Sequence, residues 1–202
     1  MSIQQKVKAI EQLFNGLQKE ISTFQLATKL HCNSGCGKCC NKADIDASPL
    51  EFLPWAYHTF LNGEASQTLD KLEKEESANC ILYKPLSVHQ QNSGQCSNYK
   101  YRGLICRLFG YGAGRDKLNK LRLATCKIIK EEQYKDFENA QIAISNGLYV
   151  PIFSDYYMQL NRIDFRMGNQ ILPINEAMKS ALETVLHYYA YRPYPKGFRN
   201  IA

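Results

Sequence analysis

The sequence predicts a mainly α-helical fold with a short β-containing, cysteine-rich metal-binding region in its middle (α+β at most). Apolar residues recur with helical spacing in the first and last parts of the chain, whereas residues 80–126 lack that period. All eight cysteines fall between positions 32 and 126. We therefore expect a single domain over 1–202, made of an N-terminal helix (1–30), a cysteine-cluster region (32–126) and a C-terminal helical part (127–202).

Composition and charge narrow the class of protein. The chain has 202 residues, of which 45% are hydrophobic and 22% are charged, so it is long enough and apolar enough to bury a core without disulfides. Its formal charge of +6 is a modest excess that favours solubility over nucleic-acid binding. The sequence shows neither the apolar core of a secretory signal nor a long apolar run. We expect no membrane association and a cytoplasmic location, where thiols stay reduced.

The first predicted element is a long helix over residues 2–30. Its apolar residues follow a 3–4 spacing that places them on one face: Ile3, Val7, Ile10, Phe14, Leu17, Ile21 and Phe24. A helix lying on the core explains this face. A dimerisation seam is the alternative, although about three heptads are marginal for an independent coiled coil.

A second helix is expected to begin at Ser48. Ser48 is the N-cap, Pro49 takes the first helical position and Glu51 closes a capping box. The helix should end at Asn62-Gly63, and Pro54 lies early enough in it to be tolerated, with a kink. A charged helix over 65–78 should follow.

The remaining elements are predicted from shorter patterns. We expect a strand over 80–83, a polar loop over 89–94, short strands and turns without helix over 96–114, and a strand over 121–125. Helices are expected over 130–146 and 154–168, and Asn175 should cap a last helix that runs to Tyr191.

The cysteines have the spacing of a metal site. Cys32-x3-Cys36-x2-Cys39 places three soft ligands on one loop, and Gly35 and Gly37 let the backbone fold around an ion. Their share, about 4% of the chain, is below that of a disulfide scaffold. Sulfur ligands favour zinc or iron–sulfur centres. The candidate metal ligands are Cys32, Cys36, Cys39, Cys40, Cys80, Cys96, Cys106 and Cys126.

The adjacent pair Cys39-Cys40 bears on the number of centres. Neighbouring side chains tend to diverge, so both thiolates are not expected to complete one compact tetrahedral site. Two centres of four cysteines, or one centre together with buried thiols, both remain open. Simple burial explains Cys126 about as well as ligation does.

The ordered cysteine motifs resemble a known family. They are Cys32-x3-Cys36-Gly37-Lys38-Cys39-Cys40, Cys80-Ile81-Leu82, Gly94-Gln95-Cys96-Ser97-Asn98-Tyr99 and Arg102-x3-Cys106-Arg107-x2-Gly110. This pattern is similar to the YkgJ-type cysteine-cluster proteins, described as zinc- or iron-chelating and related to flagellin lysine N-methylase. The resemblance implies a chelated iron–sulfur cluster, such as a 4Fe–4S cluster, or zinc. Members often carry Arg-Pro where this chain has Arg102-Gly103, which predicts a looser turn here.

Two functions follow as expectations. The first is an iron–sulfur protein with a redox or protein-modifying, methyl-transfer-like role, whose partners are metal ions and a protein substrate. The second is a zinc-stapled structural or binding module without catalytic activity. Nucleic acid is not an expected partner. No catalytic residue is assigned. His31 is a candidate extra ligand, whereas His58 and His187 are expected to be structural.

Overall fold

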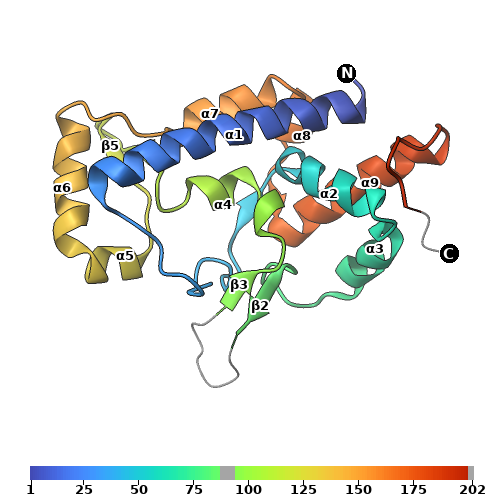
Figure 1. Ribbon diagram of the computed structural model, residues 1–202, viewed down its shortest axis with the longest axis horizontal. Helices are drawn as coiled ribbons and strands as arrows, with labels where there is room; N and C mark the ends of the chain where they lie inside the picture. The colour runs from blue at the N-terminus through green and yellow to red at the C-terminus, as the bar shows by residue number, and fades with distance from the viewer. Residues whose placement is uncertain (87–93, 200–202) are drawn as a thin grey trace. The chain divides into compact units, whose positions relative to one another are not determined.

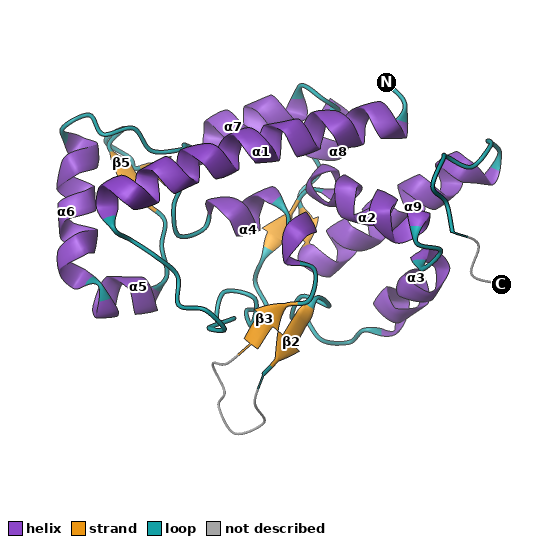
Figure 2. Cartoon of the chain, viewed as in Figure 1, coloured by secondary structure: helices purple, strands orange, loops and turns teal. Residues whose placement is uncertain are grey.

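The computed structural model describes residues 1–86 and 94–199 (Figure 1). It is mainly α-helical with short strands, as predicted (Figure 2). Apart from Gly94, the polar loop expected over 89–94, including His89, lies outside the described residues. The chain forms two compact units, the first made of residues 1–11, 35–103 and 160–202 and the second of residues 12–34 and 104–159. The single-domain organisation stays a prediction, and each unit is described by itself.

The first unit contains the start of α1 and most of the helical core. Its elements are α1 (Ile3–Thr28, to residue 11), β1 (Asp46–Ala47), η1 (Pro49–Phe52), α2 (Leu53–Leu61), α3 (Ala65–Lys74), β2 (Tyr83–Pro85), β3 (Gly94–Cys96), η2 (Tyr99–Tyr101), α8 (Phe165–Gly168), β6 (Leu172–Pro173) and α9 (Ile174–Ala190). The second unit contains the rest of α1, then α4 (Leu104–Leu108), β4 (Ala113–Arg115), β5 (Leu121–Leu123), α5 (Lys127–Glu132), α6 (Tyr134–Ser145) and most of α7 (Phe153–Asn161).

The N-terminal helix is confirmed. All seven of its predicted inward residues are buried: Ile3, Val7, Ile10, Phe14, Leu17, Ile21 and Phe24. The apolar spacing in the sequence therefore identified the face of α1 that leaves water.

Helix α9 is the centre of the first unit. It packs against α2, α3, η1 and the small β1–β6 sheet. The residues that it buries recur at helical spacing and include Ala177, Met178, Ala181, Leu182 and Val185. Because these side chains are fully buried, neighbouring helices pack closely on them, and α9 forms a firm support for the loops around it.

The helix predicted at Ser48 begins as expected, but its first turn is a 3₁₀ helix. The backbone N–H of Ser48 donates to Oε1 of Glu51 at 2.9 Å, as in a capping box. Pro54 has no N–H to donate to Leu50, whereas the N–H of Leu53 bonds the Leu50 carbonyl in the tighter pattern. The kink expected from Pro54 therefore takes the form of the short helix η1 ahead of α2.

The described strands form three two-stranded antiparallel sheets, β1–β6, β2–β3 and β4–β5. The strand predicted over 121–125 is β5, which pairs Leu123 with Ala113. The strand predicted over 80–83 begins later, at Tyr83 in β2, because the N–H of Tyr83 bonds the Cys80 carbonyl at 2.9 Å and closes a turn ahead of the strand. The absence of helix expected over 96–114 is wrong, because η2 and α4 form there.

The C-terminal helices differ from the prediction at their ends. The helix expected over 130–146 is divided at Gln133 into α5 and α6. The one expected over 154–168 is divided into α7 and α8, and α8 begins where the Asp164 carboxylate accepts the N–H of Met167. Asn175 does not cap α9, which begins one residue earlier at Ile174.

The second unit is held by side chains that reach between its elements. Gln141 on α6 covers β5, since it accepts the N–H of Leu123 and donates to the carbonyl of Leu121. Glu20 on α1 accepts the hydroxyls of Tyr149 and Tyr156, each at 2.6 Å. Desolvation and this carboxylate raise the pKa of Tyr149 to about 12, so both hydroxyls remain donors at neutral pH.

Within the described ranges, no helix is long and apolar enough to cross a bilayer.

Candidate metal centre

A glycine-rich knuckle, residues 35–41, carries three of the cysteines in the first unit. Gly35 and Gly37 have φ values of 71° and 56°, in the left-handed region that favours glycine. The N–H groups of Cys40 and Asn41 both bond the carbonyl of Gly37, at 2.9 and 3.1 Å, and close the turn. The conformation predicted for the two glycines is therefore the one that forms.

The knuckle lies directly against strand β3. The N–H of Gly94 donates to the carbonyl of Gly35 at 2.9 Å. A Cβ atom on Gly37 would lie 2.5 Å from the carbonyl carbon of Gly94, so the two backbones meet only because both residues lack a side chain. This approach brings the knuckle to the strand that ends at Cys96.

The adjacent thiols of Cys39 and Cys40 do not diverge. Their sulfur atoms lie 4.0 Å apart. Zinc–sulfur bonds of about 2.3 Å in a tetrahedron place two sulfur ligands about 3.8 Å apart, so this spacing is that of two ligands on one ion. The divergence expected for these adjacent side chains is wrong, because the tight turn replaces the extended backbone on which that expectation depends. Whether the two sulfurs share one site stays a prediction.

Electrostatics connects Cys39 to the other thiols of this unit. A hydrogen bond from the Cys40 side chain lowers the pKa of Cys39 to about 6, against partial desolvation, and the charge of Arg102 adds to the lowering. Desolvation raises the pKa of Cys96, and the neighbouring charge of Cys39 acts in the same direction. Cys39 and Cys96 thus lie within electrostatic range of each other, beside the same guanidinium.

Cys80 completes this group of thiols. Burial, with a smaller contribution from the charge of Cys96, raises the pKa of Cys80 to about 11. Nearby backbone N–H groups act in the opposite direction: those of Leu82 and Tyr83 lower the pKa of Cys80, and that of Asn98 lowers the pKa of Cys96. Such N–H donors stabilise a thiolate, whether or not it carries a metal. We call Cys39, Cys40, Cys80 and Cys96 the thiol group.

Arg102 lies beside the thiol group. Its guanidinium stacks on the ring of Tyr99, with 4.0 Å between the central carbon and the ring centroid. Four thiolates around a dication carry a net charge of −2, so a nearby positive charge offsets part of that excess.

Gly103, at the turn that the family resemblance predicted to be looser, is a site of close packing. A Cβ atom there would lie 2.8 Å from Cζ of the buried Phe52 and 3.1 Å from Oε2 of Glu51. The glycine therefore admits these two side chains to the backbone, and the looser turn expected from sequence stays a prediction.

The other predicted ligands lie partly elsewhere. Cys36 is half-buried on the knuckle, whereas Cys32, Cys106 and Cys126 belong to the second unit. The Cys126 sulfur caps α5 by accepting the N–H of Ile129 at 3.4 Å. The candidate extra ligand His31 is exposed, and its Nδ1 atom lies 3.1 Å from the carbonyl of Lys29.

All eight cysteines are thiols in this structure, and their chemistry suits a soft tetrahedral metal. Over residues 1–86 and 94–199, no group of three or more His, Cys, Asp or Glu side chains is already arranged to hold an ion. The thiol group fits a metal in its donor atoms, in the Cys39–Cys40 spacing and in its N–H donors. Closing all four sulfurs on one ion would require side-chain rotation.

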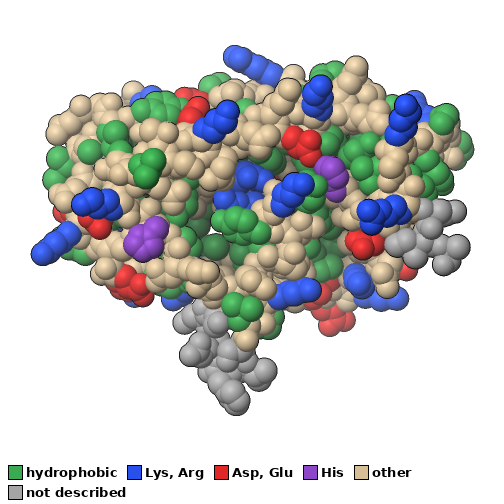
Figure 3. Space-filling view, in the orientation of Figure 1, with side chains coloured by type: hydrophobic (Ala, Val, Ile, Leu, Met, Phe, Trp, Pro, Cys, Tyr) green, Lys and Arg blue, Asp and Glu red, His purple; other side chains and the backbone are tan. Residues whose placement is uncertain are grey.

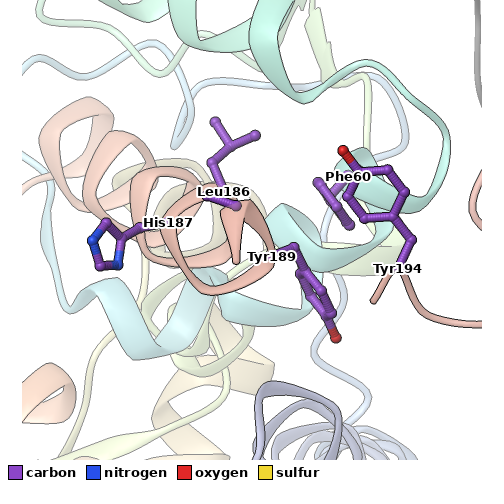
Figure 4. A pocket seen from close by; sticks show the side chains of 6 residues that line it. Phe60, Leu186, His187, Tyr189 and Tyr194 are labelled. Atoms are coloured by element: carbon purple, nitrogen blue, oxygen red, sulfur yellow. The ribbon is translucent and has the colours of Figure 1, made fainter. Parts of the chain in front are cut away.

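A pocket of about 400 Å³ lies elsewhere in the first unit, at the C-terminal end of α9 (Figure 4). Its lining consists of Phe60, Leu186, His187, Tyr189, Ala190 and Tyr194. The ring of Phe60 stacks on Tyr189, with 4.8 Å between the centroids, and meets Tyr194 edge-on. The lining contains neither a thiol nor a carboxylate, and none of its residues belongs to the thiol group.

His58, on helix α2, links elements of the first unit. Its Nε2 atom lies 2.8 Å from Glu11 and its ring stacks on Tyr101, with 4.3 Å between the centroids. These contacts join α1, α2 and η2, in agreement with the structural role expected for it.

On the face drawn in Figure 3, basic and acidic side chains are interspersed.

The pKa values predict which thiol reacts first in the metal-free protein. At pH 7, Cys39, with a pKa of about 6, should be about tenfold more thiolate than thiol, whereas Cys80, with a pKa of about 11, should be almost wholly thiol. Iodoacetamide should therefore modify Cys39 well before Cys80, as measured by peptide mass spectrometry. The Cys39 rate should fall as pH drops below about 6, and faster labelling of Cys80 at pH 7 would contradict this order.

Comparisons with known proteins agree with the chemistry of the thiols. Residues 31–140 match the family model CxxCxxCC, described as "Putative zinc- or iron-chelating domain". The match covers more than half of the chain and includes all eight cysteines. No curated protein and no solved structure matches the chain.

Proposed function

The chain belongs to the CxxCxxCC family, and on this premise we propose that its first unit binds one zinc ion through Cys39, Cys40, Cys80 and Cys96. The ion would join the knuckle to the turn and hairpin that carry the other two thiols. In this proposal the protein is a metal-stapled structural or binding module. Cys36, on the same knuckle, is the reserve ligand.

The 4.0 Å between the Cys39 and Cys40 sulfurs carries the proposal. Two thiolates at that distance match one edge of a tetrahedron around zinc. Cys96 and Cys80 would supply the other two ligands. The charge of Cys39 raises the pKa of Cys96, and that of Cys96 raises the pKa of Cys80. A 2.9 Å hydrogen bond joins Asn79, which precedes Cys80, to Asn41, which follows Cys40. The lowered pKa of Cys39 further supports a site in which one thiolate is available at neutral pH.

Zinc would supply folding free energy to a part of the unit that has little regular structure. Between α3 and α4, the described residues form only β2, β3 and the single 3₁₀ turn η2. Such a segment buries few residues, and metal–thiolate bonds offset the entropy lost when it is ordered.

An iron–sulfur cluster is the second candidate, with a redox or methyl-transfer-like role on a protein substrate. A 2Fe–2S cluster also takes four cysteines, two on each iron, and the Cys39–Cys40 spacing fits one such pair. A 4Fe–4S cluster takes one cysteine at each iron, so it is less well matched by two thiols at this distance. The reaction rests on family analogy alone.

Metal analysis of protein purified without oxygen tests the proposal. We expect a colourless protein with one zinc per chain and no acid-labile sulfide, and a chelator should lower its thermal midpoint. A brown protein with matched iron and sulfide would select the cluster instead. Protein that retains neither metal, and whose unfolding a chelator does not change, would contradict metal binding.

A further inference from the structure

We infer that three asparagines, Asn41, Asn79 and Asn175, form a relay that positions Cys40 and Cys80 for the metal. The inference rests on the proposed function and deepens it by assigning positioning residues to the same site. The sequence predicted no role for Asn41 or Asn79, and it predicted a helix cap for Asn175.

The first contact joins the two cysteine-bearing segments. The side-chain amide of Asn79 donates to Oδ1 of Asn41 at 2.9 Å. Asn41 directly follows Cys40, and Asn79 directly precedes Cys80. This one hydrogen bond therefore lies within a residue of two thiols that are far apart in sequence.

The second set of contacts fixes the Cys80 turn to α9. Oδ1 of Asn175 accepts the N–H of Ile81 at 2.9 Å, and its amide nitrogen donates to the carbonyls of Asn79 at 2.8 Å and Ser77 at 3.2 Å. Cys80 is thus held on both sides, through the residue before it and the residue after it. Only an amide of this length offers an acceptor and two donors at one position.

The support beneath this relay is firm. Asn175 lies in the first turn of α9, between Ile174 and the buried Ala177 and Met178, which belong to the core of the first unit. Packing in the core therefore fixes the position of Asn175, and Asn175 in turn restrains the Cys80 turn, which has no regular secondary structure. Preorganised ligands lose less entropy when the metal binds, and outer partners of metal ligands typically contribute about 10–100-fold to affinity.

Asn175→Asp and Asn175→Ala separate the donors from the acceptor. Aspartate keeps the acceptor for the Ile81 N–H but loses both donors, whereas alanine loses all three contacts. We expect zinc affinity, measured by competition with a chromophoric chelator, to fall about 10–100-fold in both. Asn169→Ala is the matched control, because Asn169 is exposed at the end of α8 and makes none of these contacts. Its affinity should equal that of the wild type.

Asn41→Ala and Asn79→Ala provide a second route should the Asn175 variants fail to fold. Each removes the same side-chain hydrogen bond, so the double variant should lose less affinity than the sum of the two single losses. The charge-transfer bands of the cobalt(II)-loaded protein should weaken in the same variants, which a general loss of stability would not cause in folded protein.

Hydrogen exchange at the Ile81 amide reports the contact without any metal. It should be faster in Asn175→Ala than in wild type and remain slow in Asn175→Asp. If Asn175→Ala shows fast exchange at Ile81 but binds zinc as tightly as wild type, the relay is overturned while the proposed centre stands. A wild-type protein that binds neither zinc nor cobalt would overturn the proposed function and the relay with it, even if Ile81 is protected.

Discussion

Replacing Gly37 by alanine should lower zinc affinity by about 100-fold or more, although it removes no ligand. Gly37 has a φ of 56°, and an added Cβ would lie 2.5 Å from backbone atoms of Gly94. Backbone atoms cannot rotate away as a side-chain tip can, so the knuckle must leave β3. Strained backbone and overpacking each cost about 1–3 kcal/mol. Together they should reach about 3 kcal/mol or more, measured as a weaker zinc dissociation constant.

Two other glycines are matched controls for this variant. Gly147 also has a positive φ, 99°, but an added Cβ there meets open space, so Gly147→Ala tests the cost of the conformation alone. At Gly35 an added Cβ would meet only the flexible tip of Leu86, at 3.2 Å. Zinc affinity should therefore follow the order Gly147→Ala, Gly35→Ala, Gly37→Ala, from strongest to weakest. Equal affinity in all three would contradict the docking of the knuckle on β3.

Serine in place of Cys39, Cys40, Cys80 or Cys96 should reduce zinc affinity more than any change to their surroundings. Each substitution removes one of four sulfur ligands, so the loss should exceed the factor of about 100 reached by outer partners of metal ligands. Zinc retained per chain after dialysis, together with titration of the metal-free variants, measures this effect. In the absence of zinc, the small change from sulfur to oxygen should leave the unit as folded as the metal-free wild type.

Cys126→Ser is the control for these substitutions. The Cys126 sulfur caps α5, and serine is a good N-cap, so the helix should keep or improve its capping. We expect zinc binding equal to that of wild type. If Cys126→Ser loses the metal as completely as Cys96→Ser, the ligand set extends beyond the thiol group and the single-ion proposal is wrong.

The zinc content per chain and the Cys126→Ser variant also address the number of centres. The sequence left open two sets of four cysteines, or one centre together with buried thiols. Five cysteines belong to the first unit, and three belong to the second. The thiol group takes four of the five. One zinc per chain and an unaffected Cys126→Ser variant would favour a single centre.

Patterns local to the chain were sufficient for α1 and for the start of the helix at Ser48. The face of α1 follows from seven apolar residues at helical spacing, and the start at Ser48 follows from cap chemistry. Both depend on neighbours in the sequence, which is why they were predictable. The short helix α4 was missed because five residues are too few to establish a period.

The sequence by itself determined the family, the candidate ligands and the need for glycine at positions 35 and 37. Only the tertiary structure decided that the Cys39 and Cys40 sulfurs lie 4.0 Å apart, and that Asn175 holds the Cys80 turn instead of capping its helix. These features depend on contacts between residues far apart in the chain. Such contacts are set by how the elements pack, and a spacing of cysteines or a single asparagine carries no local signal of them.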